Sequence, residues 1–481
     1  MYCLIDQHGA MSGHPSHQLA FDKADDEPTL LAWWAFDGEC LQIQADRLGV
    51  IPLFHGVLPT GGYVVSDSLL EACSLAGQPL DLDHAAIAVF LRLGYYLGED
   101  TPFRALRVLA PGERIHFTPR RLTRHVPDLP IMAPRALPRD AAIREYDSLF
   151  SEAIRARSVG TQLKTLPLSG GRDSRHILLE LDRLGRRPER AVISARSGTD
   201  DTDRAVTLAK YLDLDIDLVT QPEDFFALEK EKNRRNHFLT DENAWYLPIA
   251  QHLQGTVLDG LGGDVLSNGY GFKRRLASLM ADNRLSEAAS FLLPSTASTK
   301  VLKPFYRDQW SRTVAMNRLH AELARHAKAP NPVASFLFWN RTRREVALIP
   351  LTLIAPRADV ALPYLDASLL DFFLSLPAED FGEPGFHDEV LATTYPKASQ
   401  LPYATKKKAT GQRWARIKRS RAYHQQLRAA FDLYRHGHLV GHGCLPYLLE
   451  SFITGHDRPI SWPFRPLHPL EQLLEHTAVR M

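Results

Sequence analysis

The run Ser169-Gly170-Gly171-Arg172-Asp173-Ser174 combines residue types that bind phosphate. Two adjacent glycines let the backbone turn tightly and bring its N–H groups to phosphate oxygens. The serine hydroxyls add hydrogen-bond donors, and a helix that begins here would add partial positive charge. A plain glycine turn between a strand and a helix is the alternative, and Ser-Gly-Gly alone would favour it. With the flanking elements and Asp173 included, we predict a phosphate site formed by Ser169, Gly170, Gly171, Asp173 and Ser174.

Asp173 adds a requirement to this loop. A carboxylate would repel phosphate unless a cation lay between them, so the loop implies Mg²⁺ shared by carboxylate and phosphate. The loop is not a Walker A motif, because no lysine follows its glycines, and it is not the dinucleotide fingerprint.

The elements that must position the loop alternate between strand and helix. Apolar residues recur at helical spacing from Ile143 to Ile154, ahead of the first strand. The following order is strand, helix, strand, helix, strand, at 165–169, 174–185, 191–194, 203–212 and 216–220. This alternation predicts an α/β fold with a parallel sheet covered by helices, and it places the loop at the carboxyl end of a strand. The remaining sequence to Met481 is mostly helical in pattern.

The sequence before this region has a different pattern. Short β-prone runs bounded by Gly, Asp and Pro predict strands and turns. One short helix follows Asp83, a plausible N-cap, and Pro111-Gly112 predicts the turn of a hairpin. Five prolines between 118 and 138 disfavour helix and central strand, which indicates a linker. We therefore divide the chain into residues 1–125, a proline-rich linker at 126–139, and residues 140–481.

Composition excludes several classes of protein. The 481 residues are 44% hydrophobic and 23% charged, and 57 Lys and Arg against 56 Asp and Glu give a formal net charge of +1. That balance provides no overall field for nucleic acid or an anionic membrane, and no apolar run is long enough to span a bilayer. Four scattered cysteines fit a reducing interior better than a disulfide framework, and the N-terminus is not a signal peptide. We expect a soluble cytoplasmic protein without nucleic-acid or membrane partners.

Several segments, in the same order along the chain, resemble the asparagine synthetase-like family of PP-loop ATP pyrophosphatases. LPLSGGRDSRHILLEL is similar to the PP-loop, whose SGGxDS pattern binds the pyrophosphate of ATP. LDGLGGDVLSNGY, at 258–270, resembles the second ATP and Mg²⁺ segment, usually SGxGxDExxxGY, and ALPYLDASLLDFFLSLP, at 361–377, resembles the helical PFLD segment. ADRLGVIPLFHG and FRALRVLAPGERIHF resemble parts of the family's N-terminal glutaminase domain. The resemblance implies a β-rich αββα-type glutaminase-like domain followed by a PP-loop synthetase domain with a helical C-terminal part.

The resemblance also implies a reaction. Such enzymes use ATP to adenylate a carboxylate, with release of pyrophosphate, and an amine or ammonia then displaces AMP to form an amide. Asp173 and Asp264 fall on the family's Mg²⁺-binding aspartates. Lys406, Lys407 and Lys408 lie where the family often has a lysine near the phosphates, and we prefer Lys408 as catalytic, although a solvated basic loop is an equal alternative. Asp359 keeps the acidic character of the first position in ExRxPFLD and would accept a proton from the amine, or else be a solvated carboxylate.

The N-terminal part departs from the family at the positions that make a glutaminase. Such an enzyme uses a cysteine immediately after the initiator Met, with its own α-amine as base. Here Tyr2 precedes Cys3, and the glutamine-holding motifs RGPD and NGEIYN are missing. We predict no glutamine hydrolysis. The amine would then be a second substrate, free ammonia, or part of the same molecule, as in β-lactam synthetases and lasso-peptide cyclases that form a macrolactam.

The synthetase part departs in places too. Arg172 replaces a usually apolar residue, Val265 replaces the common Glu, and Ala361 replaces the family's arginine, which argues against aspartate as substrate. Arg172, Arg175 and His176 are either contacts for an anion or exposed positions on the first helical turn.

Two alternatives remain open. In the first, the chain is a catalytically inactive ATP-binding scaffold that serves a biosynthetic partner protein. A different kind of site, a transition-metal centre, would use His436, His438, His442 and Cys444, although the glycines between them prevent any fixed helical face.

Overall fold

A computed structural model describes residues 1–195, 200–222, 225–294, 298–382, 385–404, 421–456 and 458–480. The three candidate lysines, Lys406, Lys407 and Lys408, lie outside the described residues. The chain forms a mixed α/β structure, with strands at both its beginning and its middle and helices over most of the rest. Within the described ranges, no helix is both long enough and apolar enough to cross a membrane.

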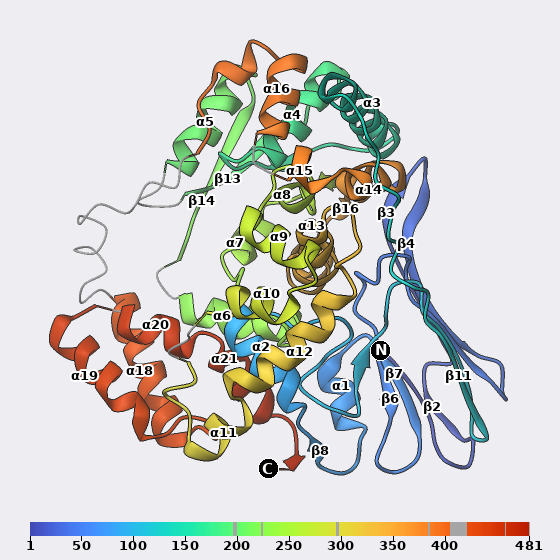
Figure 1. The fold of residues 1–481 in the computed structure, drawn as a ribbon, viewed down its shortest axis with the longest axis vertical. Helices are drawn as coiled ribbons and strands as arrows, with labels where there is room; N and C mark the ends of the chain where they lie inside the picture. The colour runs from blue at the N-terminus through green and yellow to red at the C-terminus, as the bar shows by residue number, and fades with distance from the viewer. Residues whose placement is uncertain are drawn as a thin grey trace.

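The N-terminal part contains two five-stranded antiparallel sheets, which lie together on one side of the molecule (Figure 1). The first has the order β2 (Met11–Gly13), β1 (Tyr2–Ile5), β7 (Tyr63–Ser66), β6 (Phe54–Val57), β9 (Arg107–Val108). The second has the order β11 (Arg121–His125), β10 (Arg114–Thr118), β5 (Leu41–Gln44), β4 (Glu27–Phe36), β3 (Ser16–Ala24). The two sheets pack face to face: Tyr63 of β7 stacks on Phe117 of β10, with ring centroids 4.7 Å apart.

Short helices accompany these sheets. α1 (Leu69–Ser74) follows β7, and α2 (His84–Leu93) is capped by Asp83, whose carboxylate accepts from the Ala86 N–H, as the sequence predicts. The hairpin predicted around Pro111-Gly112 is wrong. β9 pairs with β6 in the first sheet, whereas β10 pairs with β5 and β11 in the second. The turn at Pro111-Gly112, where Gly112 has a φ of 63°, therefore connects a strand of the first sheet to a strand of the second.

Residues 126–138 form neither helix nor strand and connect β11 to α3 (Arg139–Ser158). This is the segment in which the prolines argue against regular structure. α3 begins at Arg139, one residue before the predicted start of the second part.

The predicted alternation of strands and helices after α3 is confirmed. β12 (Thr165–Pro167), β13 (Arg190–Ala195) and β14 (Asp215–Thr220) form a parallel sheet in that order. α4 (Asp173–Arg183) and α5 (Asp201–Tyr211) are the connecting helices. A second parallel pair, β15 (Thr256–Leu258) with β16 (Asp359–Ala361), lies beside β12, because the Thr165 hydroxyl and the backbone of Gln254 exchange hydrogen bonds of 2.8 and 3.0 Å.

The rest of the chain is mostly helical. Its α-helices are α6 (Phe225–Arg235), α7 (Tyr246–Ala250), α8 (Gly263–Leu266), α9 (Arg274–Ala281), α10 (Leu285–Leu292), α11 (Pro304–Gln309), α12 (Arg312–Ala324), α13 (Pro332–Leu337), α14 (Ala367–Ser375), α15 (Ala378–Phe381), α16 (Phe386–Thr394), α18 (Arg421–His436), α19 (Leu445–Thr454), α20 (Arg458–Phe464) and α21 (Leu467–Leu474). Among the described residues of this part there are also two π-helices, η1 (Phe338–Val346) and η2 (Ile349–Ile354), and three 3₁₀ turns, η3 (Pro363–Leu365), η4 (Ala398–Gln400) and η5 (His442–Cys444). Near the C-terminus, β17 (Val479–Arg480) pairs with β8 (Leu80–Asp81) of the N-terminal part.

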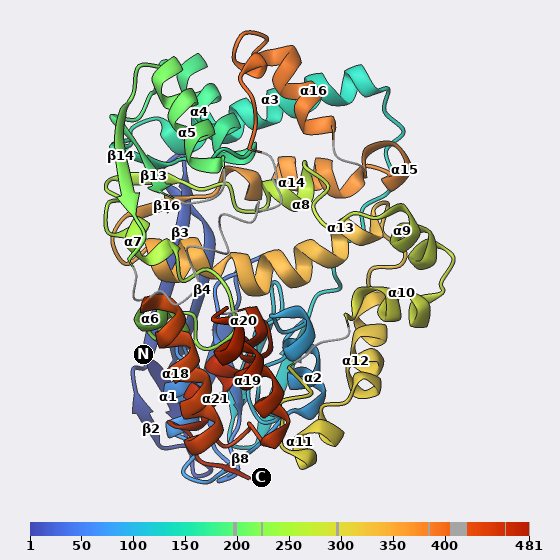
Figure 2. The same cartoon turned by 90° about the vertical axis from the view of Figure 1, so that its left-hand side faces the viewer.

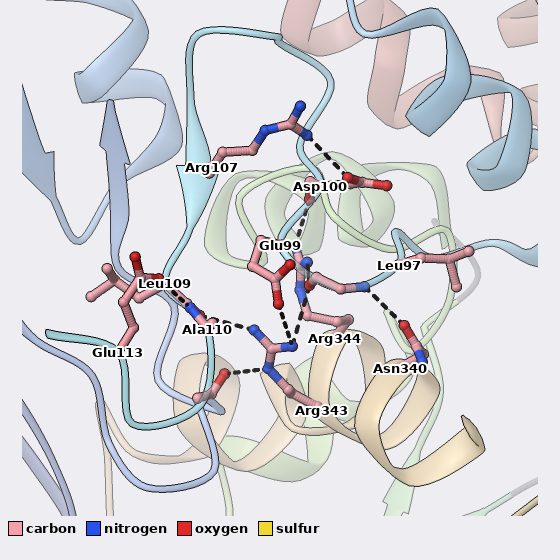
Figure 3. Close-up of polar contacts among 12 residues, drawn as sticks. Leu97, Glu99, Asp100, Arg107, Leu109, Ala110, Glu113, Asn340, Arg343 and Arg344 are labelled. Carbon is pink, nitrogen blue, oxygen red and sulfur yellow. Dashed lines mark hydrogen bonds and ion pairs between the residues drawn. The ribbon is translucent and has the colours of Figure 1, made fainter. Parts of the chain in front are cut away.

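α13, η1 and η2 follow one another as a long helical rod across the middle of the molecule (Figure 2). One side of η1 is docked into loops of the N-terminal part (Figure 3). Arg343 donates to the carbonyls of Gly49 and Leu109, both at 2.9 Å, and Arg344 donates to the carbonyl of Asp100 at 2.8 Å. Both arginines are 3% exposed, so these carbonyls replace water around the guanidinium groups. The rod is therefore fixed by the N-terminal part.

A second contact between the two parts is a buried ion pair. Arg157 of α3 binds Asp22 of β3 through Nε at 2.7 Å and Nη2 at 2.9 Å, and both side chains are fully buried. The Leu362 N–H donates to the same carboxylate at 2.7 Å. The N-terminal sheets and the region around β16 are thus joined by charge-assisted hydrogen bonds.

Candidate active site

The loop predicted to bind phosphate lies where the sequence places it, between the end of β12 and the beginning of α4. Its N–H groups are engaged by side-chain oxygens: Gly170 donates to Oδ1 of Asp201 at 3.1 Å, and Gly171 donates to Oγ of Ser169 at 3.2 Å. Ser174 Oγ accepts from the Ser169 N–H at 3.1 Å. A carboxylate oxygen of the chain itself thus accepts from the Gly170 amide, which is the interaction expected of an anion-binding turn.

Gly170 is required by close packing. A Cβ built there would lie 2.8 Å from the Asp201 carbonyl oxygen and 2.9 Å from Cβ of Ala404. Ala404 donates its N–H to the Gly170 carbonyl at 2.9 Å. The chain after α16 therefore returns to the loop just before the lysine run begins.

Arg172 and Arg175, which the sequence leaves as either anion contacts or exposed positions, have other partners. Arg172 forms a two-point ion pair with Asp388 of α16, at 2.5 and 2.8 Å. Arg175 is fully buried and donates to the carbonyls of Leu401 and Pro402, at 2.9 and 3.0 Å. Both guanidinium groups hold the segment that covers the loop.

The second predicted segment meets the loop. α8 carries Asp264, and its glycines pack on the side chain of Asp173. A Cβ at Gly260 would lie 2.9 Å from Cβ of Asp173, and one at Gly263 would lie 2.7 Å from its Oδ1. The glycines of this segment therefore let the two aspartate-bearing segments approach each other closely.

Asp173 and Asp264 line one cavity of about 310 Å³ together with Ser169, Ser174 and two further carboxylates, Asp201 and Asp259, the second of which directly follows β15. Apolar and aromatic side chains form the other walls, namely Leu168, Val192, Trp245, Tyr246, Ile249, Leu261, Val346 and Ile349. The cavity is thus lined by both carboxylates and apolar side chains. It lies at the carboxyl edge of the parallel strands, where α/β proteins bind their ligands.

The carboxylates at this edge are electrostatically strained. Burial, followed by repulsion from Asp264 and Asp259, raises the pKa of Asp173 well above its usual range. Burial and the charge of Asp264 raise the pKa of Asp259 to about 6. The negative charge of Asp264 is partly compensated, because its Oδ2 accepts a hydrogen bond from Nη1 of Arg341 in η1 at 3.0 Å. Repulsion of this kind is what a bound divalent cation would relieve.

The donor set fits Mg²⁺ only in combination with a ligand. Among the side chains that the structure describes, no group of three or more His, Cys, Asp or Glu could hold a metal ion by itself. Mg²⁺ is usually bound by one or two carboxylates together with substrate phosphates and water. Asp173 and Asp264 beside a candidate phosphate loop match that pattern.

Asp359 is not brought to this cavity. It is the first residue of β16 and pairs with Thr256 at the start of β15, whereas the carboxyl ends of these strands point toward Asp259. Asp359 lines a separate cavity of about 490 Å³ between β3, the end of α3 and the start of β16. The sequence motif gives its distance from Pro363 along the chain but not the edge of the sheet at which it lies.

The candidate metal centre near the C-terminus is not assembled. His438 Nδ1 pairs with Oε1 of Glu471 at 2.8 Å, and His442 Nδ1 lies 2.9 Å from the hydroxyl of Tyr434. Cys444 is fully buried. Among the described residues, these side chains do not form a group of three or more that could hold a metal ion.

Cys3 is placed as a core residue. It lies in the middle of β1, between Gly13 of β2 and Val65 of β7, and none of its surface is exposed. Burial raises the pKa of its thiol to about 11, so the thiolate needed for nucleophilic attack is disfavoured. The α-amine of Met1 is held by ion pairs with Asp67 and Glu71.

Two residues of the site were missed in the sequence. Asp259 stands at the serine position of the segment usually written SGxGxDE, directly after an apolar strand, and that substitution was a usable signal. Arg341 has no motif around it, and only the fold brings it to Asp264.

The fold and this cavity define an α/β protein with an aspartate-lined cavity at the carboxyl edge of a parallel sheet. A family model described as asparagine synthase matches residues 145–387, about half of the chain. The chain belongs to the asparagine synthase family, whose members are ATP-dependent amide-forming synthetases. A comparison with curated proteins gave no match.

Proposed function

We propose that the protein adenylates a carboxylate with ATP and transfers the acyl group to an amine or ammonia. A carboxylate oxygen of the substrate attacks the α-phosphorus of ATP, the bond to the β-phosphate oxygen breaks, and pyrophosphate leaves. The nitrogen then attacks the acyl carbon, AMP leaves with the electron pair of the C–O bond, and the nitrogen loses a proton. The products are an amide, AMP and pyrophosphate.

One observation carries this proposal: Asp173 and Asp264, from segments far apart in sequence, line one cavity with the serines of the loop. Asp173 and Asp264 would hold Mg²⁺, with Asp259 nearby to strengthen the negative potential. Mg²⁺ bound there would neutralise charge on the departing pyrophosphate. Ser169, Gly170, Gly171 and Ser174 would bind phosphate oxygens, and a phosphate would replace the Asp201 carboxylate at the Gly170 amide.

The apolar walls of the cavity suit the base and ribose of a nucleotide, since ligand pockets are lined mainly by apolar and aromatic side chains. Trp245 and Tyr246 supply aromatic surface next to the carboxylates. The position of Asp359 in another cavity argues against our expectation that it accepts the proton of the amine.

Lys408 remains our candidate for charge stabilisation in the transition state. It lies four residues beyond Ala404, which is hydrogen-bonded to Gly170, and four residues of extended chain span at most about 14 Å. Lys408→Ala should then reduce turnover by about 100-fold or more, as loss of a transition-state donor does. Lys406→Ala and Lys407→Ala are the matched controls, and equal effects of all three would remove the preference for Lys408.

The nitrogen would not come from glutamine hydrolysis by this chain. Cys3 is buried within a sheet, and Tyr2 separates it from Met1. We therefore expect the amine to be a second substrate, ammonia supplied from elsewhere, or a group of the same molecule, as in macrolactam formation by a lasso-peptide cyclase.

The experiment that tests the function is ATP–pyrophosphate exchange with a panel of small-molecule and peptide carboxylates. Wild-type protein should catalyse exchange with at least one of them in the presence of Mg²⁺, and Asp173→Ala should abolish it. Glu287→Ala, at an exposed position in α10, is the control. Exchange that survives Asp173→Ala would overturn the mechanism, and nucleotide binding without any exchange would favour an inactive scaffold.

A further inference from the structure

Behind Asp173, away from the cavity, lies a buried cluster of polar side chains that the proposed reaction does not use. His176 of α4 and His387 of α16 are both fully buried, and Ser267 is 2% exposed. His387 Nδ1 lies 2.9 Å from Ser267 Oγ and 3.7 Å from Oδ1 of Asp173. On the other side of the ring, His387 Nε2 lies 3.0 Å from His176 Nδ1.

The hydrogen bonds around this cluster determine where its protons lie. The single hydroxyl proton of Ser267 is directed to the Gly263 carbonyl at 2.8 Å, so its oxygen accepts from Nδ1–H of His387. A ring that carries its proton on Nδ1 presents Nε2 as an acceptor, and Nε2 of the fully buried His387 lies 3.0 Å from Nδ1 of His176, which donates to it. In this assignment the nitrogen of His387 that carries the proton, and donates it to Ser267, is also the one that lies 3.7 Å from Oδ1 of Asp173.

The opposite assignment, in which Nε2 of His387 carries the proton and donates to His176, is unfavourable at both histidines. It would turn the lone pair of His387 Nδ1 toward the oxygen of Ser267, whose only proton is already donated to the Gly263 carbonyl. It would also put a proton on His176 Nε2, which is buried and has no hydrogen-bond partner among the described residues. A buried donor without an acceptor costs the full free energy of its desolvation.

The contacts of Asp173 are concentrated on one of its oxygens. Asn268 Nδ2 donates to Oδ1 at 3.3 Å, and Nδ1 of His387 lies 3.7 Å from the same atom. Gly263 also packs against Oδ1. Oδ2 is therefore the oxygen that remains for a ligand in the cavity.

α16 is well fixed for such a role. The residue after His387 is Asp388, which binds Arg172 of the loop, and the next is Glu389, which binds Arg139 of α3 at 2.7 and 2.9 Å. Three consecutive residues thus hold the start of α16 against the loop and α3. This arrangement leaves the ring of His387 little freedom to move relative to Asp173.

We propose that His387 is a positioning residue that orients the Asp173 carboxylate toward a cation, and that His176 fixes the tautomer of His387. The inference rests on the proposed function in one respect, namely that Asp173 holds the cation. Groups behind a metal ligand that fix its orientation commonly change metal affinity by about 10- to 100-fold when they are removed.

Mn²⁺ binding in the presence of a non-hydrolysable ATP analogue, followed by electron paramagnetic resonance, tests the proposal. His387→Asn keeps a donor near the position of Nδ1, whereas His387→Gln places its amide near Nε2, and His387→Leu has no donor. We expect affinity within about threefold of wild type for Asn, and a loss of about tenfold or more for Gln and Leu. His55→Leu, which removes a buried histidine bonded to Tyr63 in the N-terminal part, is the control and should leave Mn²⁺ affinity unchanged.

Exchange assays provide a second readout. The Mg²⁺ concentration for half-maximal exchange should rise in His387→Gln, while the rate at saturating Mg²⁺ is largely retained. If Leu does not fold, the comparison of Asn with Gln decides the question. Equal Mn²⁺ affinities in wild type, Asn and Gln would overturn the positioning role, whereas wild-type protein that binds no Mn²⁺ with the analogue would overturn the proposed function itself.

Discussion

Gly263 and Asp173 are packed so closely that no side chain fits between them, since a Cβ on Gly263 would lie 2.7 Å from Oδ1 of Asp173 and 2.8 Å from its Cγ. Gly263 is the first residue of α8, and its φ is not in the left-handed region. Backbone conformation therefore does not require a glycine at this position. The close approach of the neighbouring carboxylate does.

Gly263→Ala should weaken binding of the Mg²⁺–ATP analogue by about tenfold or more, because the methyl group displaces a carboxylate whose placement the cation depends on. Helix propensity acts in the opposite direction, since Ala is favoured over Gly by up to about 1 kcal/mol in a helix. The thermal unfolding temperature should therefore change little while affinity falls, which titration calorimetry would measure. Ser278→Ala, an exposed position in α9, is the control. Wild-type affinity in Gly263→Ala would mean that Asp173 does not contribute to binding.

Asp259 gives the unliganded protein a dependence on pH with a defined sign. Its pKa is raised from 3.8 to about 6, so the folded chain holds this proton more tightly than the unfolded chain. The stabilisation is present below the unfolded pKa and is lost as pH rises through about 6. A shift of about two pKa units corresponds to about 3 kcal/mol.

Asp259→Asn resembles the protonated form at every pH and keeps an acceptor for the Leu261 N–H. Its stability relative to wild type should therefore increase between pH 4 and pH 7, by up to about 3 kcal/mol, without Mg²⁺ or nucleotide. Thermal unfolding of both proteins across this range checks the prediction. A constant difference would show that Asp259 does not titrate there.

The sequence was sufficient for the parts of the fold that depend on neighbours in the chain. β12, α4, β13, α5 and β14 follow from hydrophobic period and glycine placement, and the Asp83 cap follows from a local side-chain hydrogen bond. The partner with which a strand pairs is not determined by its neighbours in the chain. The prediction of a hairpin around Pro111-Gly112 was therefore wrong, and the two strands belong to different sheets.

The candidate site shows the same difference between features that follow from the local sequence and features that depend on packing. Motif order was enough to predict that Asp173 and Asp264 belong together, and they line one cavity. Motif order was not enough to predict the position of Asp359, because the edge of the sheet at which a residue lies depends on strand register. Contacts such as Arg341 with Asp264, or His387 with Asp173, join helices whose packing no sequence pattern encodes.

Cys3 should be chemically inert in the folded protein. Its thiol is fully buried in β1, and its pKa is raised to about 11, whereas Cys40 in the same part of the chain is partly exposed. Iodoacetamide should therefore modify Cys40 in native protein and reach Cys3 only after denaturation, as peptide mass spectrometry would show. Cys3→Ser should leave ATP–pyrophosphate exchange unchanged, and wild type should release no glutamate from glutamine. Glutamate release that Cys3→Ser abolishes would contradict our view of this domain.

The N-terminal part should support the synthetase site through η1. Arg343 is 3% exposed and donates to three carbonyls, those of Gly49, Leu109 and, at 3.3 Å, Gly98. Arg343→Met leaves these buried carbonyls without their donor, which should lower the free energy of unfolding by about 3 kcal/mol.

The same substitution should also reach the cavity, because η1 carries Arg341, whose guanidinium binds Asp264 at 3.0 Å. We expect weaker binding of the Mg²⁺–ATP analogue in Arg343→Met at a temperature where the variant remains folded. Arg357→Met, at an exposed position just after η2, removes the same charge without these contacts and should change neither property. If Arg343→Met is destabilised but binds the Mg²⁺–ATP analogue with wild-type affinity, the N-terminal part contributes to folding and not to the site. Loss of both would show that the sheets hold one wall of the nucleotide cavity in place.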